Sequence, residues 1–176
     1  MTPRCGITCW RRLTGSPGPR RRPAPFHGNF DEFRDALDEA SDVLYLADNA
    51  GEIVADQVLI RELGPARVTV AVRGGPVLND ATMHDARQTG LTSIVPVIDN
   101  GSDAPGTLLP DCSPAFRARF ASADLVIAKG QGNFESLCDA DRTVFALFKV
   151  KCGVVAEHTG LPVGTHVLAA TGARHG

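Results

Sequence analysis

Three short apolar runs, each ending in polar and glycine residues, constrain this chain most. The first is Val43–Ala47, which runs into the stretch DNAGE at 48–52. The other two lie within RVTVAVRGGPVLNDAT at 67–82 and ADLVIAKGQGNFE at 123–135. Continuous apolar runs are typical of strands buried on both faces of a parallel sheet. Because ligands bind beyond the carboxyl ends of such strands, the carboxylate, amide and ammonium groups that follow are predicted to converge at one edge.

Helix-like and strand-like segments alternate along the chain. Apolar residues at helical spacing predict helices at 30–40, 53–63, 80–88, 115–121 and 134–138, with a helical turn at 154–158. Apolar runs predict strands at 43–47, 68–72, 93–98, 124–128, 143–150 and 166–169. Such alternation implies parallel pairing with right-handed crossovers. The predicted fold class is therefore α/β: a three-layer α/β/α Rossmann-like sandwich with a mainly parallel sheet.

The chain of 176 residues is expected to hold one folded domain at 29–170. Residues 1–28 are rich in Arg, Pro and Gly without a sustained period, which predicts a disordered tail, and 171–176 form a second short tail. The first 30 residues carry six Arg and no acid, whereas the remainder has 12 basic and 20 acidic residues, a net charge of −8. An acidic body argues against a nucleic-acid partner and favours cations.

Two further features of the composition narrow the class of protein. No apolar run approaches the roughly 20 residues of a membrane helix, so no membrane partner is expected. The five cysteines are scattered, odd in number and without a C-x-x-C pair, which is typical of reduced thiols in a cytoplasmic protein.

The first polar stretch, Asp48 to Glu52, admits two interpretations. As the start of a helix, Asn49 would be the N-cap and Glu52, three residues later, would complete a capping box. That interpretation leaves Asp48 at the end of a buried strand without a partner, where ionised carboxylates are usually paired or bound to metal. A metal site and a helix cap are weighted about equally on this stretch alone.

The second stretch contains the Gly74–Gly75 pair and Asp80. A glycine pair after a strand allows a ligand to approach backbone amides closely, which makes Gly75 a candidate ligand-binding residue. Asp80 is explained equally well as the N-cap of the next helix. Its matching place in the strand–loop–helix plan favours a metal ligand, because Asp48, Asn49 and Asp80 offer only oxygen donors. Such donors suit a hard cation such as Mg²⁺ or Mn²⁺.

The third stretch, KGQGNFE, begins at Lys129 and contains Gly130 and Gly132. A Gly-x-Gly pair between a strand and a helix resembles a phosphate-binding loop, and Lys129 adds a cation. The dinucleotide fingerprint is incomplete, because Glu135 occupies the place of its third glycine. A tight turn with Lys129 in solvent is the alternative. Asp56, Arg73, Lys149 and Lys151 lie near the motifs and are interpreted either as supporting contacts or as surface charges.

Taken together, the ordered motifs DNAGE, RGGPVLNDAT, ADLVIAKGQGNFE and FKVKC resemble the metal-dependent damage-control phosphatase family, long catalogued as a domain of unknown function. The resemblance spans about residues 42–168. It implies that Asp48, Asn49 and Asp80 occupy the positions of divalent-metal ligands and that Lys129 and Asn133 contact phosphate. It also implies a Rossmann-like sandwich and the hydrolysis of phosphate monoesters, including sugar phosphates and damaged metabolites.

The expected function is thus hydrolysis of a small phosphorylated metabolite by a metal-activated water, which Glu52 orients. Lys129 and the amides at Gly130–Asn133 would bind the remaining phosphate oxygens. The expected cofactor is a divalent ion: Mn²⁺, Mg²⁺, Co²⁺ or Ni²⁺. Members of the family resemble this chain only after an additional helical N-terminal region, for which residues 1–42 offer little room. The chain is therefore expected to lack that region.

Two other classes of function stay open from the sequence. One is a nucleotide- or dinucleotide-binding enzyme that uses Gly130–Gly132 as its phosphate loop. The other is a truncated, non-catalytic module that binds metal or phosphate without turnover. Fold alone does not choose among them.

Overall fold

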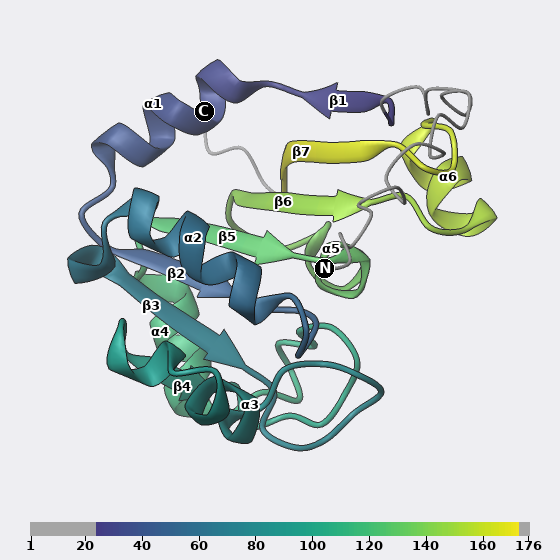
Figure 1. Cartoon of the computed structure of the whole chain (residues 1–176). Coiled ribbons are helices and arrows are strands. Elements are labelled where there is room, and N and C mark those ends of the chain that lie inside the picture. Colours follow the sequence, from purple (N-terminus) through teal and green to yellow (C-terminus); the bar gives the residue numbers. More distant parts are fainter. Residues whose placement is uncertain (1–23, 173–176) are drawn as a thin grey trace, which may run out of the picture.

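A seven-stranded sheet forms the centre of the computed structural model, which describes residues 24–172 (Figure 1). The strand order is β1-β7-β6-β5-β2-β3-β4, and all neighbouring pairs are parallel except β6 with β7. The strands are β1 (Phe26–Gly28), β2 (Val43–Leu46), β3 (Val68–Val72), β4 (Val97–Asp99), β5 (Leu125–Lys129), β6 (Val144–Lys149) and β7 (His166–Thr171). The predicted, mainly parallel α/β fold is confirmed.

Helices cover both faces of the sheet, which gives the three predicted layers (Figure 1). They are α1 (Phe30–Glu39), α2 (Ile53–Leu63), α3 (Met83–Gln88), α4 (Pro114–Ser122), α5 (Gln131–Leu137) and α6 (Gly153–Thr159), with short 3₁₀ turns at Pro65–Arg67 and Leu91–Ser93. One core packs the first three helices against Tyr45, Val70 and Ile127. A second core packs α4 and α5 against Leu44 and Val126 on the opposite face.

Alternation along the buried strands explains this two-sided core. Every residue of β2 is buried, and successive side chains point to opposite faces, so both faces of the strand must be apolar. The three strands followed by the polar stretches are neighbours, in the order β5-β2-β3. Their carboxyl ends lie on the right-hand side of Figure 1, so the polar residues after them share one edge as predicted. None of the helices among residues 24–172 is long and apolar enough to cross a membrane.

Helix α3 begins three residues later than predicted and α5 three residues earlier, and two further segments differ more from the sequence expectations. Phe26–Gly28 were expected to belong to a disordered tail but form β1, which pairs with β7; a three-residue strand is too short to show a period. The remainder of the expected tail up to residue 23, and the end of the chain after 172, lie outside the described residues. The strand predicted at 93–98 is replaced by a 3₁₀ turn and the shorter β4, which begins after Pro96, a residue with no backbone donor for a ladder.

Candidate active site

Backbone hydrogen bonds hold the stretch after β2 beside the stretch after β3. Asn49 and Asp80 form an isolated antiparallel bridge. The amide of Ala81 donates to the carbonyl of Asp48 at 2.7 Å, and the amide of Ala50 donates to the carbonyl of Asn79 at 2.9 Å. Ala81 is buried in the core, which anchors the bridge. The structure thus brings the three predicted metal ligands, Asp48, Asn49 and Asp80, together at one sheet edge.

The Asp48 carboxylate lies against the backbone of Gly130, the residue that follows β5. Gly130 has a φ of +82°, a conformation that favours glycine, and a β-carbon there would overlap the carboxylate. Burial raises the pKa of Asp48, and the Asp80 and Glu52 carboxylates raise it further, while Lys151 and Arg73 oppose the shift. Close carboxylates in a partly buried site disfavour each other's charge, which a bound cation would relieve.

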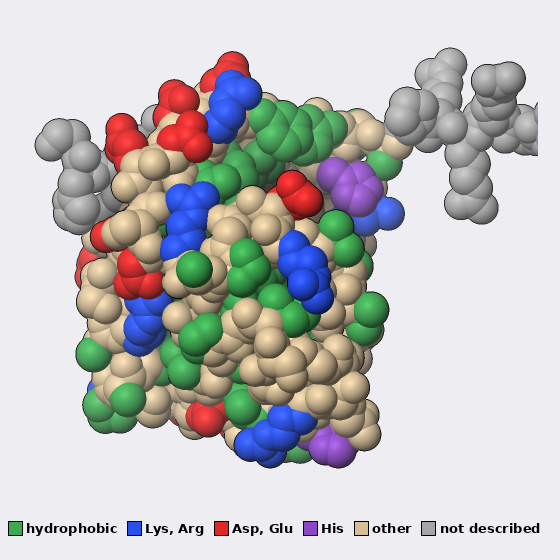
Figure 2. Space-filling model, turned by 60° about the vertical axis from the view of Figure 1, so that its left-hand side comes forward, with side chains coloured by type: hydrophobic (Ala, Val, Ile, Leu, Met, Phe, Trp, Pro, Cys, Tyr) green, Lys and Arg blue, Asp and Glu red, His purple; other side chains and the backbone are tan. Residues whose placement is uncertain are grey.

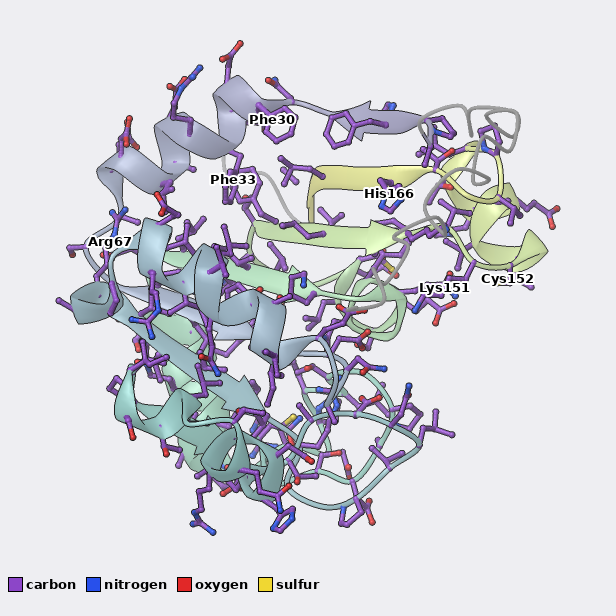
Figure 3. All side chains as sticks on the ribbon, viewed as in Figure 1. Phe30, Phe33, Arg67, Lys151, Cys152 and His166 are labelled. Atoms are coloured by element: carbon purple, nitrogen blue, oxygen red, sulfur yellow. The ribbon has the colours of Figure 1, made fainter. Side chains whose placement is uncertain are left out.

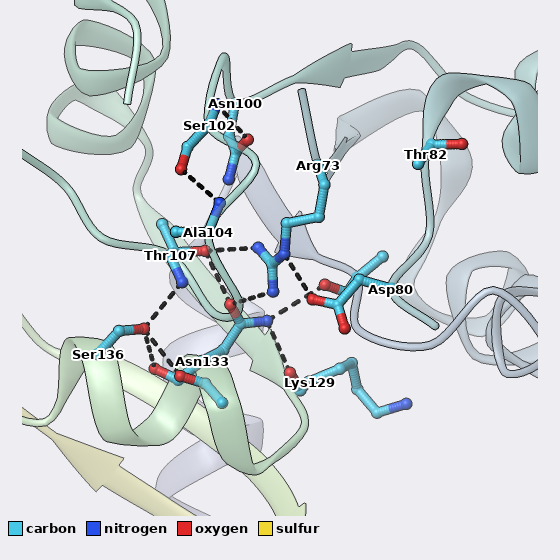
Figure 4. Close-up of polar contacts among 12 residues, drawn as sticks. Arg73, Asp80, Thr82, Asn100, Ser102, Ala104, Thr107, Lys129, Asn133 and Ser136 are labelled. Carbon is cyan, nitrogen blue, oxygen red and sulfur yellow. Dashed lines mark hydrogen bonds and ion pairs between the residues drawn. The ribbon is translucent and has the colours of Figure 1, made fainter. Parts of the chain in front are cut away.

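The buried side chain of Arg73 holds the Asp80 carboxylate in place (Figure 4). Arg73, at the end of β3, is only 3% exposed. Its Nε donates to Asp80 Oδ2 at 2.7 Å, and its other two nitrogens donate to Thr107 Oγ1 and Asn133 Oδ1, each at 3.0 Å. A buried guanidinium needs such partners to offset its desolvation. Arg73 therefore fixes one carboxylate oxygen of Asp80.

Asn133 lies beneath the site and its side chain is fully hydrogen-bonded. Its Oδ1 accepts from Arg73 and from Thr107, and its Nδ2 donates to the carbonyls of Ala47 and Lys129. The residue is completely buried. This placement makes the Asn133 side chain a link between β2, β3 and β5, and the residue does not line the cleft, so its contact with phosphate stays a prediction.

Lys129 is paired with Asp56 on α2 and with Glu52, the N-cap residue of that helix. Its Nζ lies 2.6 Å from Asp56 Oδ1 and 3.5 Å from Glu52 Oε2. Asp56 is 5% exposed, whereas Glu52 is exposed at the rim. Burial, and then the Asp56 and Glu52 carboxylates, raise the pKa of the Tyr45 phenol, whose oxygen lies in the core under α2. Lys129 is thus not a solvated surface lysine; it is anchored from below by Asp56.

The first turn after β2 differs in detail from the capping box that the sequence suggested. Asn49 Oδ1 accepts from the amide of Gly51 at 2.7 Å, and its carbonyl accepts from the amides of Glu52 and Ile53. Glu52 itself occupies the N-cap position and its side chain makes no capping hydrogen bond. Asp80 does not cap α3 either, because Thr82 and Asp85 form the capping box of that helix. Neither Asn49 nor Asp80 is thus the N-cap of a helix, although the Asn49 side-chain oxygen accepts one turn hydrogen bond.

The predicted glycine contacts are used mainly for packing. The Gly130 amide donates to the Leu147 carbonyl at 2.9 Å, and Gly132 packs against Gly106 in the loop that follows β4. Gly75 lies against Asp103, in the same loop. The remaining amides of the first turn of α5 have no partner within the helix, as in any α-helix. Because the Asp48 carboxylate occupies the approach to Gly130, a dinucleotide pyrophosphate cannot use this glycine pair in the usual way.

A cleft of about 460 Å³ opens beside these residues. Asp48, Glu52, Lys129 and Gly130 line it where β2 and β5 end, and further lining residues come from β6, β7, β1 and α1. Figure 2 shows an apolar patch near the acidic side chains of α1, and the described chain exposes Phe26 and Phe30 to 50% and 60%. The site thus continues from the polar edge into a partly apolar trough.

Asp48 and Asp80 together with the side-chain amide of Asn49 provide a set of donors that fits a divalent cation. Among residues 24–172, no group of three or more His, Cys, Asp and Glu side chains is arranged to hold a metal ion. Two carboxylates, Asp48 and Asp80, and the carboxamide of Asn49 are the oxygen donors brought together here. Oxygen donors of this kind suit hard divalent ions that retain water ligands.

Sequence reasoning found the residues at the strand ends but not the network below them. Arg73 and Asp56 were noted without a firm role, and Thr107 and Tyr45 were missed. A signal for Asp56 was present, because Ile53, Asp56 and Ile60 share one face of α2 and an acid among buried positions calls for a buried partner. Thr107 lies in an irregular loop, where no pattern points to it.

Comparison with known proteins places the chain in a family. Residues 23–167 match the family model of the damage-control phosphatase ARMT1-like domain. The uncharacterized protein MJ0202 of Methanocaldococcus jannaschii is 42% identical over 149 residues, which cover 78% of this chain and 49% of that protein. The damage-control phosphatase PH1575 of Pyrococcus horikoshii is 40% identical over 140 residues, covering 77% of this chain and 49% of that protein. The damage-control phosphatase of Archaeoglobus fulgidus is 37% identical over 129 residues, covering 71% and 45%.

A solved structure agrees with the sequence comparisons. The crystal structure of PH1575, described as a DUF89 family protein, matches with a TM-score of 0.78 and 35% identity over 86% of this chain and 54% of that chain. The chain spans about half the length of the curated relatives it matches. Because both its sequence and its fold match, the chain belongs to the damage-control phosphatase ARMT1-like domain family.

Proposed function

We propose that this chain is a metal-dependent phosphatase domain that hydrolyses phosphate monoesters of small metabolites, such as sugar phosphates or damaged phosphorylated intermediates. The observation that carries the proposal is the bridge that sets Asn49 beside Asp80, with Asp48 against Gly130 and the ammonium group of Lys129 at the end of the neighbouring strand. The names of the relatives in Pyrococcus and Archaeoglobus support the phosphatase class.

In this proposal Asp48, Asn49 and Asp80 hold one divalent ion, Mn²⁺, Mg²⁺, Co²⁺ or Ni²⁺. When bound, such an ion neutralises phosphoryl charge and acidifies a water molecule. Arg73 keeps the Asp80 carboxylate oriented through its short ion pair. Tight orientation of the ligands matters because a misplacement of about 1 Å is expected to cost roughly 10²-fold in rate.

The remaining groups of the chain bind and orient the reactants. Lys129 and the first-turn amides of α5 contact the phosphoryl oxygens, where positive charge stabilises the transition state of phosphoryl transfer. Glu52, exposed at the rim, orients the attacking water. The water oxygen bonds to phosphorus as the bond to the ester oxygen breaks, and the proton that the water releases passes to the departing alkoxide, so that the products are an alcohol and inorganic phosphate.

Hydrolysis of p-nitrophenyl phosphate tests the proposal. We expect turnover with Mn²⁺ or Co²⁺ that disappears with a chelator, and a loss of roughly 10²–10⁴-fold in Asp80→Asn. The matched control is Asp38→Asn, an exposed acid on α1, which should keep full activity. Undiminished metal-dependent activity in Asp80→Asn would remove the ligand assignment.

Two outcomes would favour the other classes. If Mn²⁺ raises the thermal unfolding midpoint while hydrolysis stays at background, the chain is a non-catalytic binding module. If NAD without metal stabilises the protein, the dinucleotide class is favoured, although the Asp48 carboxylate over Gly130 argues against it.

A further inference from the structure

All the lysines of the chain line a single cleft. The sequence contains three, Lys129, Lys149 and Lys151, whereas its other basic residues are arginines and histidines. Each of the three lines the 460 Å³ cleft, together with His166. Lys129 is anchored by Asp56, but the side chains of Lys149 and Lys151 form no ion pair with the described residues. Asp48 and Glu52 supply negative charge at one end of the cleft, whereas Lys149 and Lys151 offer it ammonium groups that no described ion pair occupies.

Strand register sets three of the lining residues in one row across the sheet. Lys149 on β6 is the register partner of His166 on β7, and His166 is in turn the partner of Phe26 on β1. Register partners present their side chains on the same face of a sheet. All three side chains are exposed. In Figure 3, His166 lies beside the carboxyl end of β6, and Lys151 lies just beyond that end.

Lys149 and His166 lie two and three strands away from β2, which leads to the proposed metal ligand Asp48. Asp48 follows β2, and β5 separates it from β6, which carries Lys149. Neighbouring strands are about 4.8 Å apart, so the backbone of Lys149 lies roughly 10 Å and that of His166 roughly 14 Å to the side of Asp48. A single phosphate group cannot span this interval, but a phosphate ester with a second charged end can.

The floor between the two ends is apolar. Leu147 and Leu168 are register partners one step inward from the row, and both line the cleft. At the far side, Phe26 stacks on Phe30 with ring centroids 4.8 Å apart. Apolar and aromatic side chains with a few charged groups at the ends are typical of sites that bind a ring or hydrocarbon skeleton.

Resting on the proposed phosphatase function, we propose that Lys149 and His166 form a subsite for a second anionic group of the substrate. The substrate class is then a phosphate monoester that carries a carboxylate or another phosphate on a ring or apolar skeleton, which lies over Leu147 and Leu168. The phosphate to be hydrolysed binds near Asp48 and Lys129, and the second anion fixes the orientation of the skeleton. Discrimination against neutral substrates arises because the ammonium group of Lys149 then has no anionic partner in the cleft.

A pair of probes of equal shape tests this subsite. We compare kcat/KM for 4-carboxyphenyl phosphate with that for its neutral carboxamide, 4-carbamoylphenyl phosphate, in the presence of Mn²⁺. Exposed ion pairs contribute modestly, so we expect the wild-type protein to favour the carboxylate about fivefold. The ratio should fall to about one in the double variant Lys149→Gln, His166→Gln. The control is Arg61→Gln, His84→Gln, which removes one cationic side chain and one histidine from exposed positions outside the cleft and should keep the ratio.

Binding of phosphonates separates this inference from the proposed function. The dissociation constants of 4-(phosphonomethyl)benzoate and of the matching benzamide, measured by calorimetry with Mn²⁺, need no turnover. Absent hydrolysis with a preference for the benzoate that the double variant loses would overturn the phosphatase proposal and keep the subsite. Hydrolysis of both esters with a ratio of one in the wild-type protein would overturn the subsite alone.

Discussion

The carboxylate of Asp48 occupies the space where a β-carbon of residue 130 would lie. Built on the Gly130 backbone, that carbon would come 2.5 Å from Asp48 Oδ1 and closer still to the other atoms of the carboxylate. The contact joins the residue after β2 to the residue after β5, so the position of a proposed metal ligand depends on a glycine 82 residues later in the chain.

Gly130→Ala should therefore damage both stability and activity. The left-handed backbone and the overlap with Asp48 are each unfavourable, and we expect the free energy of unfolding to fall by about 2–4 kcal/mol. Urea denaturation measures this change, and hydrolysis of p-nitrophenyl phosphate should drop to background. The control is Gly153→Ala at the start of α6, where a β-carbon meets no atom and φ is not positive. Equal stability of the two variants would contradict the close contact.

Arg73→Met should be among the most destabilising substitutions near the site. It leaves the Asp80 carboxylate buried without its ion pair and removes the donors to Thr107 and Asn133. Breaking a buried ion pair from one side costs about 3–5 kcal/mol, and we expect a loss in that range in urea denaturation. Arg73→Lys should recover only part, because an ammonium group cannot reproduce the planar fork of donors.

An exposed arginine provides the comparison for that experiment. Arg87→Met, on α3, removes the same charge from an exposed position and should change stability by less than about 0.5 kcal/mol. If Arg73→Met lost as little stability as Arg87→Met, the proposal that Arg73 fixes the Asp80 carboxylate would be contradicted.

The sheet was predictable because each central strand is apolar on both faces. The runs at β2 and β3 are almost entirely apolar, so their burial follows from their composition, and their parallel pairing follows from the helices that alternate with the strands. Both ends of α2 were predicted. Its C-terminal end was clear because Gly64 and Pro65 follow the last helical residue. Phe26–Gly28 carry no such pattern, because β1 is a three-residue edge strand whose pairing depends on β7 at the other end of the chain.

The site was predictable to the extent that strand ends predict convergence. Asp48 and Asn49, which follow β2, lie together with Asp80, which follows β3, as expected from neighbouring strands. What the sequence did not indicate is how they are held. The contacts of Arg73 reach Thr107 and Asn133, 34 and 60 residues away, and such pairing depends on the tertiary fold instead of any local period. The roles of Asp48, Asn49, Glu52 and Lys129 in catalysis stay predictions.

Stability should depend on pH through Asp124, at a distance from the proposed site. Its Oδ2 accepts from the hydroxyl and amide of Ser41 and from the amide of Asp42, and the Ser41 hydrogen bonds lower its pKa below the ordinary value of 3.8. A lowered pKa in the folded state stabilises the fold above the unfolded value, and the contribution is lost as the pH falls through the folded value.

Asp124→Asn should consequently be less stable than the wild type at pH 7. The difference should shrink as the pH falls below about 3.8 and vanish once Asp124 is protonated in both states. Thermal unfolding at a series of pH values measures it, with Asp35→Asn on the surface of α1 as the control. A stability difference that persisted unchanged at low pH would show that charge on Asp124 is not its source.

Asp48→Asn should raise the stability of the metal-free protein while it lowers the phosphatase activity. In the absence of metal, burial and the Asp80 and Glu52 carboxylates disfavour the charge on Asp48, so a neutral amide of the same shape should raise the thermal midpoint by about 2–4 °C. The same substitution removes a proposed metal ligand, so Mn²⁺ should stabilise the wild-type protein but not the variant. Hydrolysis should fall roughly 10²–10⁴-fold. A variant that is less stable without metal and is still stabilised by Mn²⁺ would contradict the site as described. The first result would show that the charge on Asp48 does not destabilise the fold, and the second that Asp48 does not bind the cation.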